Sequence, residues 1–347
     1  MTSNASDVST SAGIIRLGNA FCDAKALLTA VELDVFSALH DAPATETEIR
    51  DRLALHGRGL SDFLDLLVAL GLLIAEDGTY RNAEGADEYL VRGRASYVGG
   101  FLRRTDRSRY PLWGKLAGAL RTGSPQSEMD FKSLLDDPVL VDQFVQMMDS
   151  LTQVISKELL DAFDWGRYGS ILDVGGCRGN VAGNIVKRYP ALAGAVFDMP
   201  QLEPFFEEHV AYLGLTGRIR FHGGNFFADP LPDSDVVVMG HVLHNWNREQ
   251  RRSLVEKAYA AVNPGGALVV YDRMLDDDSS KHIENLVISL DMLLVSEGGS
   301  GYRTEELRGH AETAGFTSFT ARPLGDYDTL VVCHKGEEEP RSKIGSA

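Results

Sequence analysis

The chain has 347 residues, of which 44% are hydrophobic and 24% are charged, and its net charge at pH 7 is -16. At about 150 residues per domain, this length predicts two domains with enough apolar side chains for their cores. A chain this acidic repels nucleic acids and anionic membranes, and its apolar runs stay well short of the ~20 residues that span a bilayer, so we expect neither partner.

The first segment, residues 1–12, is rich in Ser, Thr and Asn and lacks the basic start and apolar stretch of a signal peptide. We therefore interpret it as a frayed tail. Cys22, Cys177 and Cys333 are far apart and form no CxxC pair, which favours a reducing compartment over a disulfide framework or a zinc ribbon. Together these features predict a cytoplasmic protein.

The chain up to about residue 100 predicts helices and one hairpin. Apolar residues recur at helical spacing over 14–28. The segment Thr45–Glu48 has the pattern of a capping box that begins a second helix, and a third helix begins near Ser61. Two short extended runs flank Asp77-Gly78, a dipeptide typical of a hairpin turn. Helices followed by a hairpin predict a winged-helix-like domain.

A winged helix often binds DNA, but the expected third helix carries carboxylates at Asp62 and Asp65, where a DNA reader needs Arg or Lys. We therefore predict a packing or dimerisation module, and hence a homodimer that binds no nucleic acid. A regulator that senses a metabolite through a winged helix stays open as an alternative of another class.

Residues 101–165 predict helices only. Phe144, Met147 and Met148 form an apolar stripe that belongs either to a core or to the wall of an aromatic pocket. The basic run 103–109 fits a solvated helix face or a domain contact, or alternatively the recognition of a carboxylate on a substrate.

From Tyr168 onward, short apolar runs alternate with helical patterns. The expected strands are 170–174, 195–198, 219–221, 236–239 and 267–271, and the segments 316–321 and 328–333 predict an edge hairpin. Continuous apolar strands between helices predict a parallel sheet covered on both faces, which is a Rossmann-like α/β fold.

The first of these strands runs into a glycine-rich turn at residues 175–179 and then into a helix. This arrangement lets a ligand approach the backbone at the carboxyl ends of the strands. Asp173, before the turn, can face the ammonium of a methionine moiety but repels a pyrophosphate, which favours S-adenosylmethionine over a dinucleotide. Asp198 ends the next strand, and its carboxylate suits ribose hydroxyls. The alternative is that Asp173 only caps the turn.

Further motifs follow in a fixed order: GNFF at Gly224–Phe227, HVLHNW at His241–Trp246 and NPGG at Asn263–Gly266. With DVGG at Asp173–Gly176 and the apolar segment Leu64–Leu73, they make the chain resemble the small-molecule O-methyltransferases of plants and bacteria. That family includes caffeic acid, acetylserotonin and polyketide O-methyltransferases. The resemblance covers nearly the whole chain and implies a dimerisation helix at the apolar segment.

The resemblance also implies a role for each matching residue. The expected cofactor residues are Asp173, Gly175, Gly176, Asp198, Met199, Asn225 and Phe226. His244 is expected to be the general base, Asp272 orients it, and Tyr302 stands where the family has a second acidic residue beside the base. The expected substrate residues are Phe144, Met148, His241, Trp246 and Met292. The implied activity is transfer of a methyl group from S-adenosylmethionine to a small phenolic acceptor in secondary metabolism, such as antibiotic biosynthesis.

The chemistry of methyl transfer agrees with this role for His244. A phenol, with a pKa near ~10, needs a base at neutral pH. Histidine suits the task, and a carboxylate behind it fixes its tautomer. A structural core histidine is the alternative. A metal site formed with His241 and Asp272 is disfavoured because a third clear ligand is lacking, so we expect no metal.

The sequence departs from the family pattern at four positions. Cys177 replaces a glycine and narrows the loop, and Asn225 replaces an aspartate and removes a charge near the adenine. Asn245 replaces the aspartate after the base, and Tyr302 is a poor base at pH 7. Tyr302 leaves C-methylation of a phenol, or of a phenolic amino acid such as tyrosine, open beside O-methylation, because phenolate formation by His244 serves both reactions.

These expectations define two domains. Residues 1–115 form a helical, winged-helix-like dimerisation domain, and residues 116–347 form a Rossmann-like catalytic domain that binds S-adenosylmethionine and a small aromatic substrate.

Overall fold

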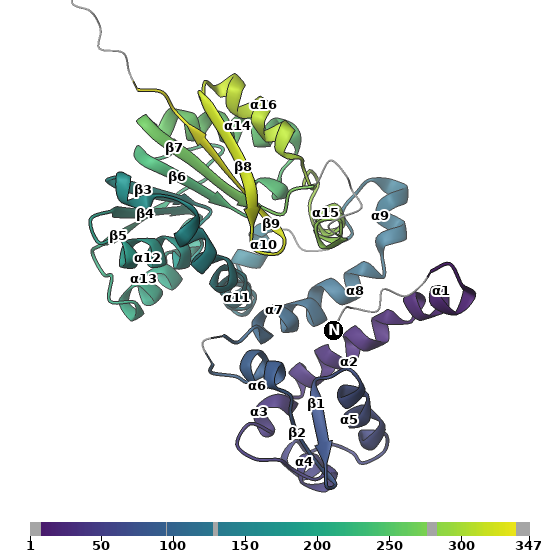
Figure 1. The fold of residues 1–347 in the computed structure, drawn as a ribbon. Coiled ribbons are helices and arrows are strands. Elements are labelled where there is room, and N and C mark those ends of the chain that lie inside the picture. The colour runs from purple at the N-terminus through teal and green to yellow at the C-terminus, as the bar shows by residue number, and fades with distance from the viewer. Residues whose placement is uncertain (1–7, 95, 128–130, 276–282, 338–347) are drawn as a thin grey trace, which may run out of the picture. The chain divides into compact units, whose positions relative to one another are not determined.

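The computed structural model describes residues 8–94, 96–127, 131–275 and 283–337. They form two compact units that divide between Pro111 and Leu112, a few residues before the division predicted after residue 115. The smaller unit is helical with a β-hairpin, and the larger unit has a central sheet (Figure 1). None of the described helices is both long and apolar enough to cross a membrane.

The N-terminal unit is built from short helices and one antiparallel hairpin. Its elements are α1 (Ser11–Gly18), α2 (Ala20–Glu32), α3 (Val35–Ala38), α4 (Glu46–Arg52), α5 (Leu60–Ala69), β1 (Leu73–Glu76), β2 (Thr79–Asn82), α6 (Glu84–Leu90), α7 (Gly99–Arg104) and the π-helical turn η1 (Thr105–Arg109). The predicted capping box is present, because Thr45 and Glu48 exchange side-chain and backbone hydrogen bonds. Asp77 and Gly78 have φ angles of 49° and 76°, as a type I′ hairpin turn requires.

The helical pattern over 14–28 is confirmed, but it is divided between two helices. These are α1 and α2, with a break at Asn19, where the backbone amide bonds back to the last turn of α1. Gly18 and Asn19 are residue types that favour a helix end, and they outweigh the apolar periodicity that continues through them.

The basic run at 103–109 bonds within the N-terminal unit. Lys25 of α2 forms an ion pair with Asp106, and the Arg103 guanidinium donates to the Val31 carbonyl, 3.3 Å away. The Arg109 guanidinium lies 5.5 Å from the centre of the Phe101 ring. Part of this run therefore fastens α7 and η1 to α2. Recognition of a substrate carboxylate by the run stays a prediction.

The C-terminal unit is built on a seven-stranded sheet. Its strands are β3 (Ser170–Val174), β4 (Ala193–Asp198), β5 (Ile219–Gly223), β6 (Ser234–Gly240), β7 (Val262–Asp272), β8 (Ser318–Leu324) and β9 (Asp328–His334), in the spatial order β5-β4-β3-β6-β7-β9-β8. The strands from β5 to β7 are parallel, while β9 and β8 form the predicted antiparallel edge hairpin. The α/β fold class is confirmed.

Helices cover both faces of this sheet (Figure 1). One face packs against α11 (Pro138–Ala162), α12 (Asn180–Arg188) and α13 (Glu203–Tyr212), and the other packs against α14 (Arg248–Ala261) and α16 (Thr304–Ala314). The remaining helices are α8 (Tyr110–Trp113), which spans the division between the units, α9 (Leu116–Thr122), α10 (Phe131–Leu135) and α15 (Ile283–Val295). Because the central strands β3, β6 and β7 are covered on both faces, they contain continuous apolar runs.

The strand order reverses direction next to β3. The chain adds β4 and β5 on one side of β3 and then crosses to β6 and β7 on the other side. In such sheets the ligand site lies outside the carboxyl ends of the strands at this switch point. Val174, Asp198, Gly240 and Asp272 end the four strands concerned, so the fold itself points to this edge.

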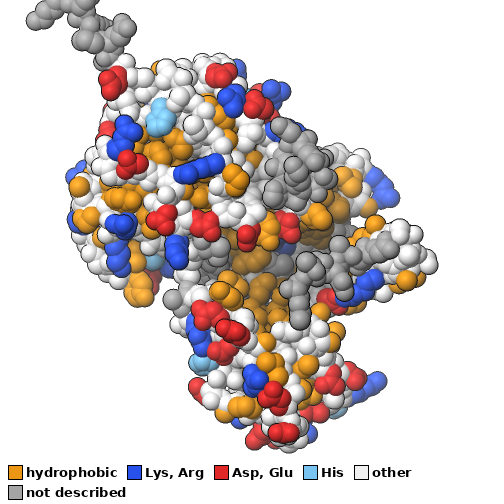
Figure 2. Space-filling view, viewed as in Figure 1, with side chains coloured by type: hydrophobic (Ala, Val, Ile, Leu, Met, Phe, Trp, Pro, Cys, Tyr) orange, Lys and Arg blue, Asp and Glu red, His pale blue; other side chains and the backbone are white. Residues whose placement is uncertain are grey.

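Carboxylate side chains are spread over the visible face of both units, with Lys and Arg interspersed among them (Figure 2). Among the described residues on that face, the basic side chains form no continuous stripe.

Candidate active site

The glycine-rich turn has the close-packed backbone that the sequence predicts. Gly175 and Gly179 have φ angles of 75° and 80°, and a Cβ added at Gly175 would lie 2.6 Å from Val242 Cγ2. Cys177 also has a positive φ of 51°, which is a strained conformation for a side chain larger than glycine. At Cys177, where this chain departs from the family pattern, the turn therefore requires a backbone conformation that glycine adopts more easily. Burial raises the pKa of the Cys177 thiol, so this cysteine stays protonated.

Asp198 is held by the backbone at the end of β4. Its two carboxylate oxygens accept hydrogen bonds from the amides of Cys177 and Met199, each at 2.7 Å. Burial raises the pKa of Asp198 to about 6, although both amides oppose the rise. The carboxylate is thus fixed beside the turn, with lone pairs left for a ligand's hydroxyl groups.

Asp173 is buried at the end of β3 with an unsatisfied oxygen. Its Oδ2 has no hydrogen-bond partner among the described residues, and a Cβ added at Gly176 would lie 2.7 Å from that atom. Burial and the nearby charge of Asp198 raise the pKa of Asp173 to about 7. Two buried carboxylates without a cation are unfavourable, so this part of the turn suits a positively charged ligand such as an ammonium group.

The predicted adenine residues lie in an aromatic group after β5. The amide oxygen of Asn225 accepts a hydrogen bond from the Phe227 backbone at 2.9 Å, which keeps the side chain within its own turn. The rings of Phe226 and Trp246 meet edge to face at 5.7 Å, and those of Phe227 and Trp246 at 4.7 Å. Trp246, predicted at the acceptor, therefore packs with the predicted adenine residue Phe226. Its buried Nε1 has no partner in the described part of the chain.

The predicted acceptor residues of α11 also lie beside the cofactor turn. Phe144 and Met148 belong to one apolar cluster with Met199 and Cys177. An ion pair between Asp149 of α11 and Arg178, with Nε 2.8 Å from Oδ1, fixes the helix against the turn. The stripe is thus a local core that touches the turn.

Met292, the remaining predicted acceptor residue, is half-buried on α15. This helix contacts η4 (Leu243–Asn245), the short 3-10 helix that carries His244. The fold therefore places the helix that carries Met292 against the turn that carries the predicted base, while contact of Met292 with an acceptor stays a prediction.

His244 and Asp272 form a hydrogen-bonded pair at the carboxyl edge. His244 Nδ1 lies 2.5 Å from Asp272 Oδ1, and the Asp272 side chain is completely buried at the end of β7. The backbone amides of His244 and Arg273 also donate to this carboxylate. Since Nδ1 is engaged, Nε2 is the nitrogen that can take up a proton.

Tyr302 completes the shell around Asp272. Its buried hydroxyl donates to Asp272 Oδ2 at 2.9 Å, and the Arg251 guanidinium lies 5.0 Å from the centre of its ring. Burial and the charge of Asp272 raise the pKa of Tyr302 well above its usual range, so the hydroxyl remains a donor. Burial alone would raise the pKa of Asp272, but His244, His241 and Tyr302 together lower it. The tyrosine that replaces a family acid therefore holds the carboxylate that pairs with His244.

His241 is engaged by a carboxylate of its own. Its Nε2 lies 2.6 Å from Asp328 Oδ1, and its ring centre is 6.1 Å from that of His244. The sequence analysis missed Asp328, because its contact with His241 joins residues 87 positions apart. Among the described residues, no group of three or more His, Cys, Asp or Glu side chains is placed to hold a metal ion.

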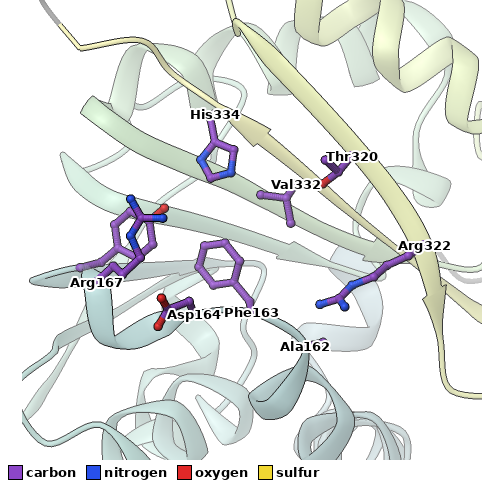
Figure 3. A pocket seen from close by; sticks show the side chains of 9 residues that line it. Ala162, Phe163, Asp164, Arg167, Thr320, Arg322, Val332 and His334 are labelled. Atoms are coloured by element: carbon purple, nitrogen blue, oxygen red, sulfur yellow. The ribbon is translucent and has the colours of Figure 1, made fainter.

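A separate hollow of about 380 Å³ lies on the same sheet (Figure 3). Its lining residues are Ala162, Phe163, Asp164, Arg167, Tyr168, Thr320, Arg322, Val332 and His334. His334 pairs with Ala267 in register, far along β7 from Asp272, so the hollow is at the other end of the strands. We do not assign it to the active site.

Comparison with known proteins identifies the family. A family model described as an O-methyltransferase domain matches residues 113–317, and one described as an O-methyltransferase dimerisation domain matches residues 15–92. The chain belongs to the O-methyltransferase family. This confirms the resemblance drawn from the motifs and favours an enzyme over the metabolite-sensing regulator.

Two relatives from Streptomyces are similar to this chain over almost its whole length. The tetracenomycin polyketide synthesis 8-O-methyl transferase TcmO of Streptomyces glaucescens is 42% identical, over 93% of this chain and 96% of its own. The N,N-dimethyltransferase OxyT of Streptomyces rimosus is 39% identical, over 94% and 97%.

Solved structures of methyltransferases share the fold. Human N-acetylserotonin methyltransferase in complex with SAM has a TM-score of 0.88 and 27% identity, over 97% of this chain and 100% of that one. PigF with SAH has a TM-score of 0.85 and 26% identity, over 94% and 100%.

Proposed function

We propose that this O-methyltransferase transfers the methyl group of S-adenosylmethionine to a hydroxyl of a small aromatic acceptor in secondary metabolism, with His244 as the general base. The observation that carries the proposal is the His244–Asp272 pair at the carboxyl edge of the sheet, beside the turn that ends β3. Family membership supplies the reaction class, and this geometry supports the assignment of His244 and Asp272 to it.

The residues of the turn fit this cofactor. When bound, S-adenosylmethionine supplies an electrophilic methyl group on a sulfonium cation. Asp173 offers an unsatisfied buried oxygen to the ammonium of the methionine moiety, and Asp198 offers its fixed carboxylate to the ribose. Phe226 supplies an aromatic edge for the adenine. Met199, whose amide orients Asp198, lines the same turn.

The base acts on the acceptor side. His244 Nε2 would take the proton of the acceptor hydroxyl, which makes that oxygen nucleophilic, and Asp272 would stabilise the resulting imidazolium. Asp272 is kept ionised for this role by its donors, Tyr302 among them. The remaining acceleration comes from holding the two reactants together in line, which is worth up to ~7–11 kcal/mol in well-oriented systems.

The relatives support an aromatic, polyketide-type acceptor. TcmO is named for 8-O-methylation in tetracenomycin polyketide synthesis, and OxyT for N,N-dimethylation. The acceptor atom is therefore proposed to be a phenolic oxygen, and an amine is the second candidate because OxyT is 39% identical. Methylation of a ring carbon uses the same base and stays a further alternative.

The protein is proposed to work as a homodimer. The family includes a dimerisation domain, and α1 and α2 leave large apolar side chains exposed, namely Ile14, Ile15, Leu17 and Phe21. Such a patch on one pair of helices is typical of a protein–protein interface.

The test is turnover with labelled S-adenosylmethionine against a panel of phenols, aryl amines and aromatic polyketides, with the methylated atom located by NMR. Transfer to oxygen that is lost in His244→Ala supports the proposal. A His209→Gln variant, which changes a buried histidine of α13, is the matched control. Transfer to nitrogen or carbon would replace the acceptor assignment, and full activity in His244→Ala would remove the base.

A further inference from the structure

A second histidine–carboxylate pair lies next to the proposed catalytic pair. The side chains of His241 and Asp328 are only 9% and 8% exposed, and Nε2 lies 2.6 Å from Oδ1. The imidazole rings of His241 and His244 are 6.1 Å apart between centres. A buried ion pair contributes little to stability by itself, so its position beside the base calls for another explanation.

The fold places both carboxylates at the same edge. β9 returns antiparallel to β7, and Asp272 stands opposite Thr329, the neighbour of Asp328. The two carboxylates therefore approach the two histidines from adjacent strands. The position of Asp328 beside His241 therefore depends on the β8–β9 edge hairpin and not on the motif His241–Trp246.

The backbone holds His241 in an unfavourable conformation. Its φ is 53°, in the left-handed region, which is unfavourable for a non-glycine residue. The His241 amide donates to the Tyr271 carbonyl at 3.0 Å, and Asn245 Nδ2 donates to the His241 carbonyl at 3.0 Å. Asn245, which replaces a family aspartate, thus clamps the strained turn. Strain that neighbouring bonds maintain is typical of functional sites.

The charges around His241 favour its protonated form. Burial lowers the pKa of His241, but the carboxylates of Asp328 and Asp272 outweigh burial and raise it, while Arg273 opposes them. Tyr271, whose ring meets that of His241 edge to face at 5.2 Å, stays neutral because burial and nearby carboxylates raise its pKa. In turn, His241 helps to lower the pKa of Asp272. A positive charge on His241 is therefore attracted to both carboxylates.

We propose that His241, held as an imidazolium by Asp328, is a positioning residue that keeps Asp272 ionised and determines the net charge of the site at which His244 accepts a proton. The inference rests on the proposed function of His244 as the base. With His244 neutral, the four side chains carry a net charge of about -1, and they become neutral when His244 takes up the acceptor's proton. The site thus favours the product of the proton transfer.

The test compares His241→Gln, Asp328→Asn and the double variant with the wild type. His241→Gln leaves two buried carboxylates without their shared cation. A unit charge at about 6 Å shifts a titration by about one to two pH units at an effective dielectric constant of ~20–40. The acid limb of the pH profile of kcat/KM should therefore shift to higher pH by that amount in His241→Gln. In the double variant it should return towards its wild-type position. The control His209→Gln should leave it unmoved.

A second readout needs no acceptor. In protein labelled with 13C at histidine Cε1, the NMR signal of His241 should report a charged ring at pH 7 in the wild type and a neutral ring in Asp328→Asn. The signal of His244 should titrate at higher pH in His241→Gln. A neutral His241 in the wild type, or an unmoved His244 signal, would overturn the inference. If no acceptor is methylated, the proposed function fails while these signals still decide the inference.

Discussion

Asp173 should stabilise the bound cofactor while destabilising the free protein. Its pKa of about 7 lies about three units above the ordinary value of 3.8, and each unit corresponds to about 1.4 kcal/mol, so ionisation costs the folded state at most about 4 kcal/mol. Asp173→Asn removes this cost but buries an amide that needs its own partners, which offsets about 1–3 kcal/mol. We expect a net gain of about 1–2 kcal/mol at pH 7.5.

The pH dependence gives the sign of this effect. Because the folded-state pKa is raised, the destabilisation is absent below about pH 4, grows as pH rises and is fully present above about pH 7. The advantage of Asp173→Asn should therefore shrink between pH 7.5 and pH 5. For a unit of this size, 1–2 kcal/mol corresponds to a rise in Tm of roughly 2–8 °C at the higher pH.

The assay is calorimetric unfolding with and without S-adenosylhomocysteine, together with titration of that ligand. Asp173→Asn should bind it about tenfold more weakly or worse, because the ammonium loses its charged partner. The matched control is Asp233→Asn, which changes an exposed carboxylate just before β6 and should alter neither quantity. A variant that is no more stable at pH 7.5 and binds the ligand as tightly as the wild type would refute the reasoning.

Further predictions concern the base, its carboxylate, the cofactor and the dimer. His244→Ala should lower kcat by about 10²–10⁴ with S-adenosylhomocysteine affinity unchanged in calorimetry, and equal kcat would exclude the base. Tyr302→Phe removes one donor from Asp272 and should lower kcat about tenfold without changing cofactor affinity; a loss of affinity would place Tyr302 at the cofactor instead. Affinity for S-adenosylhomocysteine should rise between pH 5.5 and 8 with release of protons, since its ammonium binds the ionised form of Asp173 and its ribose hydroxyls donate to the ionised form of Asp198; flat affinity and no buffer dependence of the enthalpy would contradict this. Leu17→Asp should yield monomers in sedimentation velocity where the wild type is dimeric, because it charges the exposed apolar face of α1.

Several features of the site were predictable because they depend on local sequence. Strands and helices alternate in the apolar pattern, and a residue that ends a parallel strand must lie at the shared carboxyl edge. Asp173, Asp198 and Asp272 could therefore be placed at one edge without a structure. Cys177 lies in the same turn, but only the structure shows that its φ is positive.

Other features were decided by contacts between distant segments. The sequence identified Tyr302 as an unusual residue beside the base, but its hydrogen bond to Asp272 depends on how α16 and its preceding loop pack on the sheet. The sequence predicts Trp246 at the acceptor, which stays a prediction, and only the structure shows that its ring packs against Phe226.

The amino-acid sequence by itself determined the two-part organisation and the α/β class, and it predicted the cofactor turn and the base, because the patterns behind each consist of residues that are neighbours along the chain. Only the tertiary structure decided which carboxylate serves which histidine. Asp272 and Asp328 lie on adjacent antiparallel strands, and no periodicity or spacing specifies that His241 pairs with Asp328 while His244 pairs with Asp272. That choice follows from strand register, which is set by the packing of the whole sheet.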